Sequence, residues 1–458
     1  MKTGYLLTAF SFTLAAAAAD LNRNDQWPQW RGPLALGVST TATPPTEWSE
    51  TKNVKWKVAI PGSGTATPIV WGNRIFIQTA VVTDKKVEAP AAARTEAPPA
   101  APAEGPAGKR KGGPRGGFGG GEKPANVVQF VVLCLDRGTG RTLWQKVVRE
   151  QVPHEGHHQT HGFASGSPVT DGKMLYAYFG SRGLYAMDFD GNVKWEVDLG
   201  DQQTRMGFGE GTSPALAGDR LIINWDHEGE DFVVALDKAT GKELWRKARE
   251  EKTSWATPVI LEHEGVTQAV INAGVTRSYD VKTGAVIWEC GGQTENVIPS
   301  VVSGHGLVFA MSGFRGNAVN AIKIGAKGNV AGTDAVVWTH NKGTPYVPSP
   351  LLLGNELYFF SANTARLSIF DARTGTRHVE AARIEGMTDV YASPVAANGK
   401  IYLTGRDGAF AVLKPGTTVE ILAKNKLDDS FDATPVPVGK ELLLRGQKHL
   451  YCIAETGS

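Results

Sequence analysis

Four of the chain's ten histidines lie within eight consecutive positions: His154, His157, His158 and His161. Imidazole nitrogens at such spacing can bind Zn²⁺ or Cu²⁺, and Glu155 or a residue from the next repeat could complete the site. The spacing matches no established zinc motif, however, and loop histidines often hydrogen-bond their own backbone. The segment therefore has two interpretations, a metal site or a self-supporting loop.

A second set of candidate residues follows farther along the chain. It comprises Glu210, the consecutive residues Trp225, Asp226, His227 and Glu228, and Trp255. Adjacent Asp, His and Glu side chains can form an acid/base cluster, but neighbouring charged residues of a loop are more often simply solvated. The set is therefore a candidate contact surface for a ligand or partner, and no catalytic residue is assigned within it.

Six arginines stand at or near equivalent loops of six repeats: Arg182, Arg277, Arg315, Arg366, Arg406 and Arg445. A ring of guanidinium groups could form a positively charged rim for an acidic ligand or partner. The same groups could instead satisfy backbone carbonyls of the loops between repeats. Both interpretations remain open from the residues alone.

Composition limits the classes of function. The 458 residues carry 48 Lys and Arg against 46 Asp and Glu, a net charge of only +2, which argues against specific nucleic-acid binding. The three cysteines are too few and too scattered for a disulfide framework, and two of them lie in apolar strands. No haem-attachment motif, nucleophile elbow, phosphate loop or zinc helix is present, so an enzyme is possible but unsupported.

The N-terminus indicates export. Residues 1–19 combine Lys2, an apolar stretch and a run of alanines, the pattern of a secretory signal peptide. No cysteine follows the alanines, and no other segment reaches 18 apolar residues. We therefore expect a periplasmic or secreted protein that is monomeric, with residues 20–47 as a lead-in to the folded domain.

A repeated motif sets the expected architecture. Ser or Thr followed by Pro, an apolar strand, a Gly turn and a second apolar strand recurs at intervals of roughly 41–49 residues, which suits four short strands per repeat. The motif begins at Thr67, Ser167, Ser213, Thr257, Ser349, Ser393 and Thr434, and at Pro299-Ser300 with the two residues reversed. The sequence therefore predicts an all-β, eight-bladed propeller over residues 48–455.

The second half of the repeats carries its own marks. Four share an Asp-x-x-Thr-Gly turn, beginning at Asp136, Asp237, Asp280 and Asp371, and a Trp follows most of these turns. We interpret these tryptophans as structural. The last repeat lacks its Trp strand, whereas residues 53–58 around Trp56 nearly duplicate the strand around Trp195. The N-terminal strand is therefore expected to complete the last blade and remove two exposed sheet edges.

These repeats resemble the PQQ-binding-like β-propeller superfamily, which includes quinoprotein alcohol dehydrogenases and the outer-membrane assembly factor BamB. The resemblance spans roughly residues 27–455, and the segment from Trp27 to Pro33 resembles the opening of an exported bacterial subgroup. Quinoproteins hold PQQ with Ca²⁺, a catalytic Asp and often a Cys-Cys disulfide, and this chain has no Cys-Cys pair. No cofactor is therefore predicted, although PQQ with Ca²⁺, Zn²⁺ or Cu²⁺ stays open.

An insertion rich in Ala, Pro and Gly, residues 84–125, interrupts the first blade and is expected to be disordered. In this repeat type the loops after the second and fourth strands share one face, and this face gathers the candidate residues named above. The leading hypothesis is a non-catalytic envelope module that engages a protein or polymer partner through this face. The alternatives are a PQQ- or metal-dependent oxidoreductase, a carbohydrate-active enzyme, or a metal-binding protein.

Overall fold

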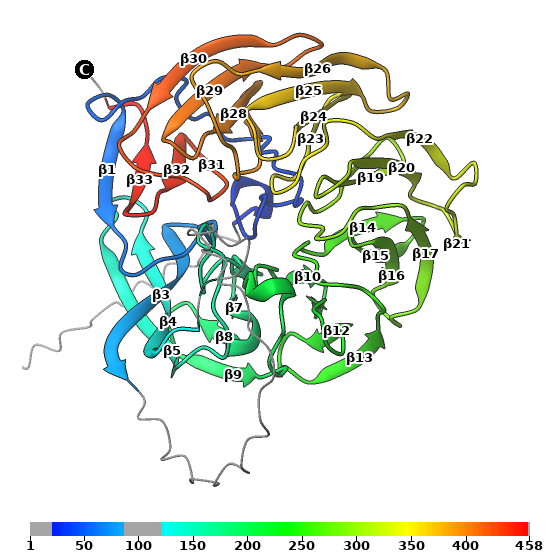
Figure 1. Ribbon diagram of the computed structural model, residues 1–458. Helices are drawn as coiled ribbons and strands as arrows, with labels where there is room; N and C mark the ends of the chain where they lie inside the picture. The colour runs from blue at the N-terminus through cyan, green and yellow to red at the C-terminus, as the bar shows by residue number, and fades with distance from the viewer. Residues whose placement is uncertain (1–20, 87–120, 122, 457–458) are drawn as a thin grey trace, which may run out of the picture.

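The computed structural model describes residues 21–86, 121 and 123–456, and it is an eight-bladed propeller (Figure 1). Each blade is an antiparallel sheet whose four strands follow one another outward from the central axis. The predicted all-β fold and the number of blades are confirmed. The signal-peptide prediction lies outside the described residues. No helix in the described part of the chain is long and apolar enough to cross a membrane.

Blades one to four contain β2 (Ile69–Trp71), β3 (Arg74–Lys86), β4 (Asn126–Asp136) and β5 (Thr142–Gln151); β6 (Val169–Thr170), β7 (Met174–Tyr178), β8 (Leu184–Asp188) and β9 (Val193–Val197); β10 (Ala215–Ala217), β11 (Arg220–Trp225), β12 (Phe232–Asp237) and β13 (Glu243–Ala248); and β14 (Val259–His263), β15 (Val266–Ile271), β16 (Val275–Asp280) and β17 (Val286–Gly291). Short 3-10 helices are η1 (Arg23–Asp25), η2 (Gly180–Arg182) and η3 (Arg205–Gly207).

Blades five to eight contain β18 (Val302–Gly304), β19 (Leu307–Ser312), β20 (Ala318–Lys323) and β22 (Val336–His340); β23 (Leu351–Leu353), β24 (Glu356–Phe360), β25 (Arg366–Asp371) and β26 (Arg377–Arg383); β27 (Val395–Ala397), β28 (Lys400–Thr404), β29 (Ala409–Lys414) and β30 (Glu420–Lys426); and β31 (Val436–Val438), β32 (Glu441–Arg445), β33 (His449–Ile453) and β1 (Val54–Ala59). The short strand β21 (Gly328–Asn329) adds to β17 in blade four.

The two ends of the chain close the ring in blade eight. Strand β1 pairs antiparallel with β33, with Val54 opposite Ile453 and Ala59 opposite His449. Figure 1 shows β1 as the outer strand beside the C-terminal strands. The expected N-terminal closure is confirmed, and the outer edge of β33 is covered as predicted.

The hydrophobic core lies between neighbouring blades. One cluster joins Tyr176 and Leu184 of blade two to Leu221 and Val234 of blade three, and all four side chains are buried. Strand faces that alternate along the pleat can both be apolar here because each sheet is covered on both sides. Burial between the sheets therefore fixes each blade against the next.

In five blades, a tryptophan of the outer strand connects the blade to the turn of the following blade. Trp195 Nε1 donates to the Lys238 carbonyl, and the ring lies under Gly241, which has a φ of +74°. A Cβ at Gly241 would lie 2.7 Å from Trp195 Cε3, so the turn needs glycine both for its conformation and for this contact. The same hydrogen bond recurs from Trp56, Trp144, Trp245 and Trp338.

Trp288 is the exception, and blade five explains it. No Asp-x-x-Thr-Gly turn follows β20, where the chain instead forms β21 and pairs it with β17. Trp288 is fully buried, and its Nε1 has no hydrogen-bond partner among the described residues. The repeat therefore loses the polar half of this contact where its turn is replaced.

The Ser/Thr-Pro motif forms a closed ring of hydrogen bonds around the axis. The backbone N–H of each motif residue donates to the side-chain hydroxyl of its counterpart in the next blade, at 2.9–3.3 Å, through Thr67, Ser167, Ser213, Thr257, Ser300, Ser349, Ser393 and Thr434. Ser300 keeps its place although its proline precedes it. The shared feature of the eight repeats is therefore the hydroxyl.

The dark blue N-terminal segment crosses the centre of Figure 1, and residues 27–31 within it contact several blades. Trp27 exchanges two backbone hydrogen bonds with Val70 of blade one. Arg31, 1% exposed, donates to the Pro350 carbonyl of blade six at 2.6 Å. Trp30 Nε1 lies 3.4 Å from Thr434 Oγ1 of the ring. The segment thus acts as a plug that contacts blades one, six and eight.

Blade one has the longest strands, and the insertion leaves from their ends. Strand β3 continues to Lys86, three residues into the range predicted for the insertion, and β4 begins at Asn126 directly after it. Residues 87–120 and 122 lie outside the described part of the chain, so the expected disorder stays a prediction. Gly121 donates its backbone N–H to the His157 carbonyl.

Candidate functional site

A cavity of about 390 Å³ opens where the central channel meets the loop face of the propeller. The loop face is defined here by the loops that follow the second and fourth strands of each blade. Six hydroxyl groups of the ring line the cavity floor beside Trp30 of the plug. The volume lies within the usual range of small-molecule sites, about 300–1,000 Å³.

The position two residues before each ring hydroxyl supplies the wall. Side chains two residues apart on an extended chain point the same way, so the eight repeats each present one residue to the cavity: Thr65, Ser165, Gly211, Trp255, Ile298, Val347, Tyr391 and Asp432. Neighbouring loops add further rings, of which Phe208, Phe314 and Tyr346 are the largest. The cavity therefore combines aromatic walls with a hydroxyl floor.

Several of these rings are held in place by their neighbours. Trp255 Nε1 donates to the Gly209 carbonyl at 2.7 Å, and Phe314 stacks on Tyr346 with 5.1 Å between ring centroids. Arg406 lies 4.1 Å from the centroid of the Tyr391 ring. The wall is thus a set of fixed aromatic surfaces.

The charges at the cavity are paired. Asp432 is the one carboxylate among the described lining residues, and Arg406 donates to both of its oxygens at 2.5 and 3.3 Å. The lining contains no lysine or arginine within the described part of the chain. The one carboxylate of the described lining is therefore already paired with a cation.

The histidine loop contributes two of its four imidazoles to the cavity. His158 and His161 line it, and their Nδ1 atoms lie 2.8 Å from the hydroxyls of Thr160 and Ser165, respectively. Burial lowers the pKa of His161 to about 4, with a smaller contribution from His157. His161 is therefore neutral at pH 7, and its Nε2 has no hydrogen-bond partner among the described residues.

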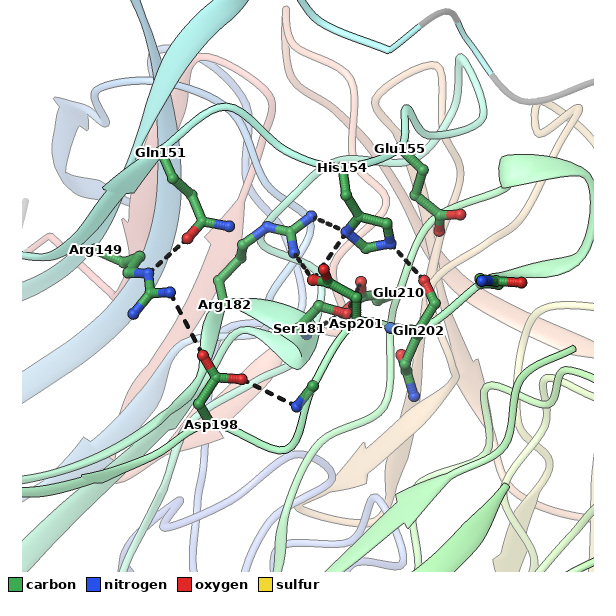
Figure 2. A network of polar contacts seen from close by, with 12 residues as sticks. Arg149, Gln151, His154, Glu155, Ser181, Arg182, Asp198, Asp201, Gln202 and Glu210 are labelled. Atoms are coloured by element: carbon green, nitrogen blue, oxygen red, sulfur yellow. Dashed lines mark hydrogen bonds and ion pairs between the residues drawn. The ribbon is translucent and has the colours of Figure 1, made fainter. Parts of the chain in front are cut away.

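His154 faces a separate polar recess between blades two and three (Figure 2). Its Nδ1 accepts from Arg182 at 2.8 Å, and its Nε2 lies 2.5 Å from the Gln202 carbonyl. Because Arg182 is a donor, Nε2 must carry the proton and donate to that carbonyl. Asp201 also pairs with Arg182, at 3.2 Å. Both ring nitrogens of His154 are therefore engaged within the protein.

Glu155 and Glu210 lie in the same recess. One ligand atom from each of His154, Glu155 and Glu210 falls within 4.8 Å of the others, the one such group that could hold a metal ion among the described residues. Glu210 accepts from the backbone and the hydroxyl of Ser181, both at 2.6 Å, and burial raises its pKa. The positive charge of Arg182 opposes this rise in the pKa of Glu210.

A shared metal site of His154, His157, His158 and His161 was one of two interpretations of the sequence, and the structure does not bring these four side chains into one such group. His157 Nδ1 instead donates to the His158 carbonyl at 2.8 Å, and the His157 ring packs edge-on against Phe163. The self-supporting interpretation of the loop describes most of its contacts, and metal binding stays a prediction.

Asp226, His227 and Glu228 follow β11 but do not face the cavity together. Asp226 pairs with Arg249 at 2.6 Å, and both side chains are 0% exposed. The His227 ring accepts from two backbone N–H groups through Nδ1, and Glu228 accepts from the hydroxyl and the backbone of Thr253. Trp225 is buried and stacks on Phe232. These groups hold the loops of blade three in place.

The six arginines do not form one rim. Arg445 is buried and donates to the Ala66 carbonyl at 2.6 Å, the structural role considered for the whole set. Arg182 and Arg277 are tied to acidic partners. Arg315 and Arg366 are exposed, so Arg406 is the member whose ion pair borders the cavity.

Trp255 of the candidate contact surface lines the cavity, as do His158 and His161 of the candidate metal ligands. Trp30, Phe208, Phe314, Tyr346, Tyr391 and Asp432 were missed. A usable signal was present in the sequence, because the eight wall residues, among them Tyr391 and Asp432, each stand two positions before a motif hydroxyl. The position two residues before each motif hydroxyl therefore predicts the residues of the cavity wall.

A family profile described as "Outer membrane protein assembly factor BamB" matches residues 129–379 and 203–457, overlapping stretches that cover more than half of the chain. No curated protein matches the sequence.

Solved structures share the fold at low identity. BamB from Moraxella catarrhalis is 15% identical with a TM-score of 0.51, over 72% of this chain and 92% of that one. The quinohemoprotein alcohol dehydrogenase from Comamonas testosteroni is 10% identical with a TM-score of 0.62, over 96% and 82%. A quinohemoprotein alcohol dehydrogenase from Pseudomonas putida HK5 is 10% identical with a TM-score of 0.55, over 95% and 81%. Such likeness establishes the fold alone.

Proposed function

Because the chain belongs to the family of outer membrane protein assembly factor BamB, we propose that it is a non-catalytic binding or assembly module of the cell envelope. It engages its partner through the loop face, and it resides in the periplasm or outside the cell. The secretory pattern of residues 1–19 supports this location.

One observation carries the proposal. The loop face holds a cavity of about 390 Å³ with aromatic walls, whereas the carboxylates of Asp226 and Asp432 are bound to arginines of the protein. Asp226 is held by Arg249, and Asp432 by Arg406. A general acid or base needs a position within hydrogen-bond reach of a substrate, and these carboxylates are already committed to structural ion pairs.

PQQ does not fit the lining of this cavity. The cofactor is an aromatic quinone with three carboxylates, and such an anion needs cationic partners or a bound metal. The described lining offers no lysine or arginine, and Asp432 adds a negative group. Arg406, the cation next to the wall, is already paired with that carboxylate. We therefore derive no reaction through a quinone.

Site-specific photo-crosslinking in the native cell tests the proposal. Benzoylphenylalanine replaces Arg315, which is exposed on the loop face, or Lys440, which is exposed in the β31–β32 turn on the opposite face. We expect a discrete envelope adduct from position 315 and none from position 440. Adducts from position 440 alone, or none from position 315, would contradict a partner on the loop face.

A further inference from the structure

We propose that the central cavity binds an uncharged sugar, the pyranose end of an envelope oligosaccharide. This rests on the proposed function, because it names the kind of ligand that the loop face would take. A pyranose ring presents hydroxyl groups around its edge and C–H groups on its faces. The cavity offers a complementary surface to each of these parts.

The floor provides hydrogen-bonding groups with unused capacity. Six hydroxyls of the ring line the cavity, those of Thr67, Ser167, Ser213, Thr257, Ser393 and Thr434. Each accepts a backbone N–H from the preceding blade, yet none donates its own proton to an acceptor among the described residues. A hydroxyl has one donor and two acceptor sites, so each retains a donor for a ligand.

The burial of these hydroxyl groups indicates that a ligand accepts their hydrogen bonds. Ser167 is 2% exposed, Ser393 3% and Thr434 4%, although their side chains face the cavity. Polar groups at such depth usually have hydrogen-bond partners. A ligand with many hydroxyl oxygens would satisfy several of the donors at once, which a hydrocarbon chain could not do.

The walls suit the faces of a sugar ring. Trp255 and Tyr391 belong to the ring of wall positions, and Trp30 closes the floor. The face of an aromatic ring carries negative charge density and attracts the weakly positive C–H groups of a pyranose. Trp255 is fixed by its bond to Gly209 and Tyr391 by Arg406, so stacking requires little ordering.

Charge favours a neutral ligand. A uronic acid or phosphate would meet Asp432 and no free cation in the described lining, and an amine would have to compete with Arg406 for Asp432. The Asp432 carboxylate, held by Arg406, can instead accept a hydrogen bond from a sugar hydroxyl.

Titration of the full mature chain with cellobiose, maltose and diacetylchitobiose tests the inference, with glucuronic acid as the charged comparison. Calorimetry measures affinity, and tryptophan fluorescence reports contact with Trp30 or Trp255. We expect at least one neutral disaccharide to bind and glucuronic acid to bind at least tenfold more weakly. No binding of the three neutral sugars, or preference for the acid, would overturn the inference.

Two serines of the hydrogen-bonded ring provide a matched pair. Ser393 lines the cavity, whereas Ser349 occupies the equivalent place in the ring without lining it. Ser393→Ala and Ser349→Ala each remove one interblade hydrogen bond, so both lower stability by similar amounts. Only Ser393→Ala should weaken sugar binding, by about tenfold for one hydrogen bond lost to a ligand. Equal affinities for the two variants would contradict the site.

Trp255→Ala should reduce sugar affinity by at least tenfold, whereas Trp195→Ala on an outer strand should not change it. Loss of binding in both variants would point to general damage and would contradict stacking in the cavity. Crosslinking from Arg315 is independent of sugar. An adduct there without sugar binding would overturn this inference and leave the loop-face proposal standing.

Discussion

Asp226 shows how a side chain from a candidate acid/base cluster can be structural, because it forms an ion pair with Arg249. Both side chains are 0% exposed, and Asp226 also accepts a hydrogen bond from Ser254 at 2.6 Å. Arg249 adds a hydrogen bond to Tyr279, which joins blade three to blade four. The sequence revealed the charge of Asp226 but could not reveal a partner 23 residues away.

Removing one member of this pair should leave a buried charge without compensation. We expect Asp226→Ala to lower the free energy of unfolding by about 3–5 kcal/mol. The half-exposed pair Arg246–Glu243 is the control, and Glu243→Ala should change it by no more than about 1 kcal/mol. Urea denaturation of the two variants measures the difference, and similar losses would contradict a structural role for Asp226.

His161 gives the protein a specific dependence on pH. Burial lowers its pKa from 6.5 to about 4, so the folded state binds fewer protons than the unfolded state between those values. The free energy of unfolding is therefore not reduced by His161 above pH 6.5. As the pH falls from 6.5 toward 4, protonation of His161 in the unfolded state lowers this free energy by up to about 3 kcal/mol. Unfolding of wild type and His161→Gln at pH 7 and 4.5 should show a smaller pH effect in the variant, and equal pH effects would contradict this assignment.

At the scale of elements, the contact between each outer-strand tryptophan and the following turn determines which glycines are essential. Gly241 and Gly265 both have positive φ, at +74° and +78°. A Cβ at Gly241 would collide with Trp195, whereas nothing lies within 4 Å of a Cβ at Gly265. A substitution at Gly265 therefore adds backbone strain alone, whereas one at Gly241 adds both backbone strain and a steric clash with Trp195.

Gly265→Ala should destabilise the protein by about 1–2 kcal/mol, the usual cost of this conformation with a side chain. Gly241→Ala should cost at least about 1 kcal/mol more, because the added methyl group displaces the indole ring. Thermal unfolding of both variants measures the two effects. Equal losses would mean that the contact with Trp195 contributes little.

The strands and turns could be predicted from the sequence because the same motif recurs in all eight blades. The strands, the interblade turns and the closing strand around Trp56 all follow from motifs that recur at a fixed interval. The strand β21 and the missing hydrogen bond of Trp288 could not be predicted, because the turn of blade five departs from the repeat only once. A single departure gives no pattern from which to read its structure.

For the whole molecule, the N-terminal segment has two separable roles, a plug in the channel and the last strand of the ring. Removal of residues 1–25 leaves both in place, whereas removal of residues 1–59 exposes the edge of β33. We expect the shorter truncation to remain folded and the longer one to aggregate, because an open strand edge pairs with other chains. Size-exclusion chromatography distinguishes them, and a monomeric longer truncation would contradict closure by β1.

The candidate site was predicted less well than the fold. The sequence placed Trp255, His158 and His161 on the correct face, but its emphasis on charged residues pointed to ion pairs that stabilise loops. Trp30 was missed because its place in the channel depends on contacts with distant blades, such as that with Thr434. Local motifs carry no record of such long-range packing.

The circle of hydroxyls has a consequence for how such a protein can change over evolutionary time. Each repeat brings one N–H group and one hydroxyl to the circle, so a duplicated repeat inserted anywhere would leave neither group without a mate. The number of blades can then increase or decrease by whole repeats while the ring of hydrogen bonds around the axis remains closed. The cavity wall can also change one repeat at a time, because the residue two positions before each ring hydroxyl can vary without breaking a hydrogen bond of the circle.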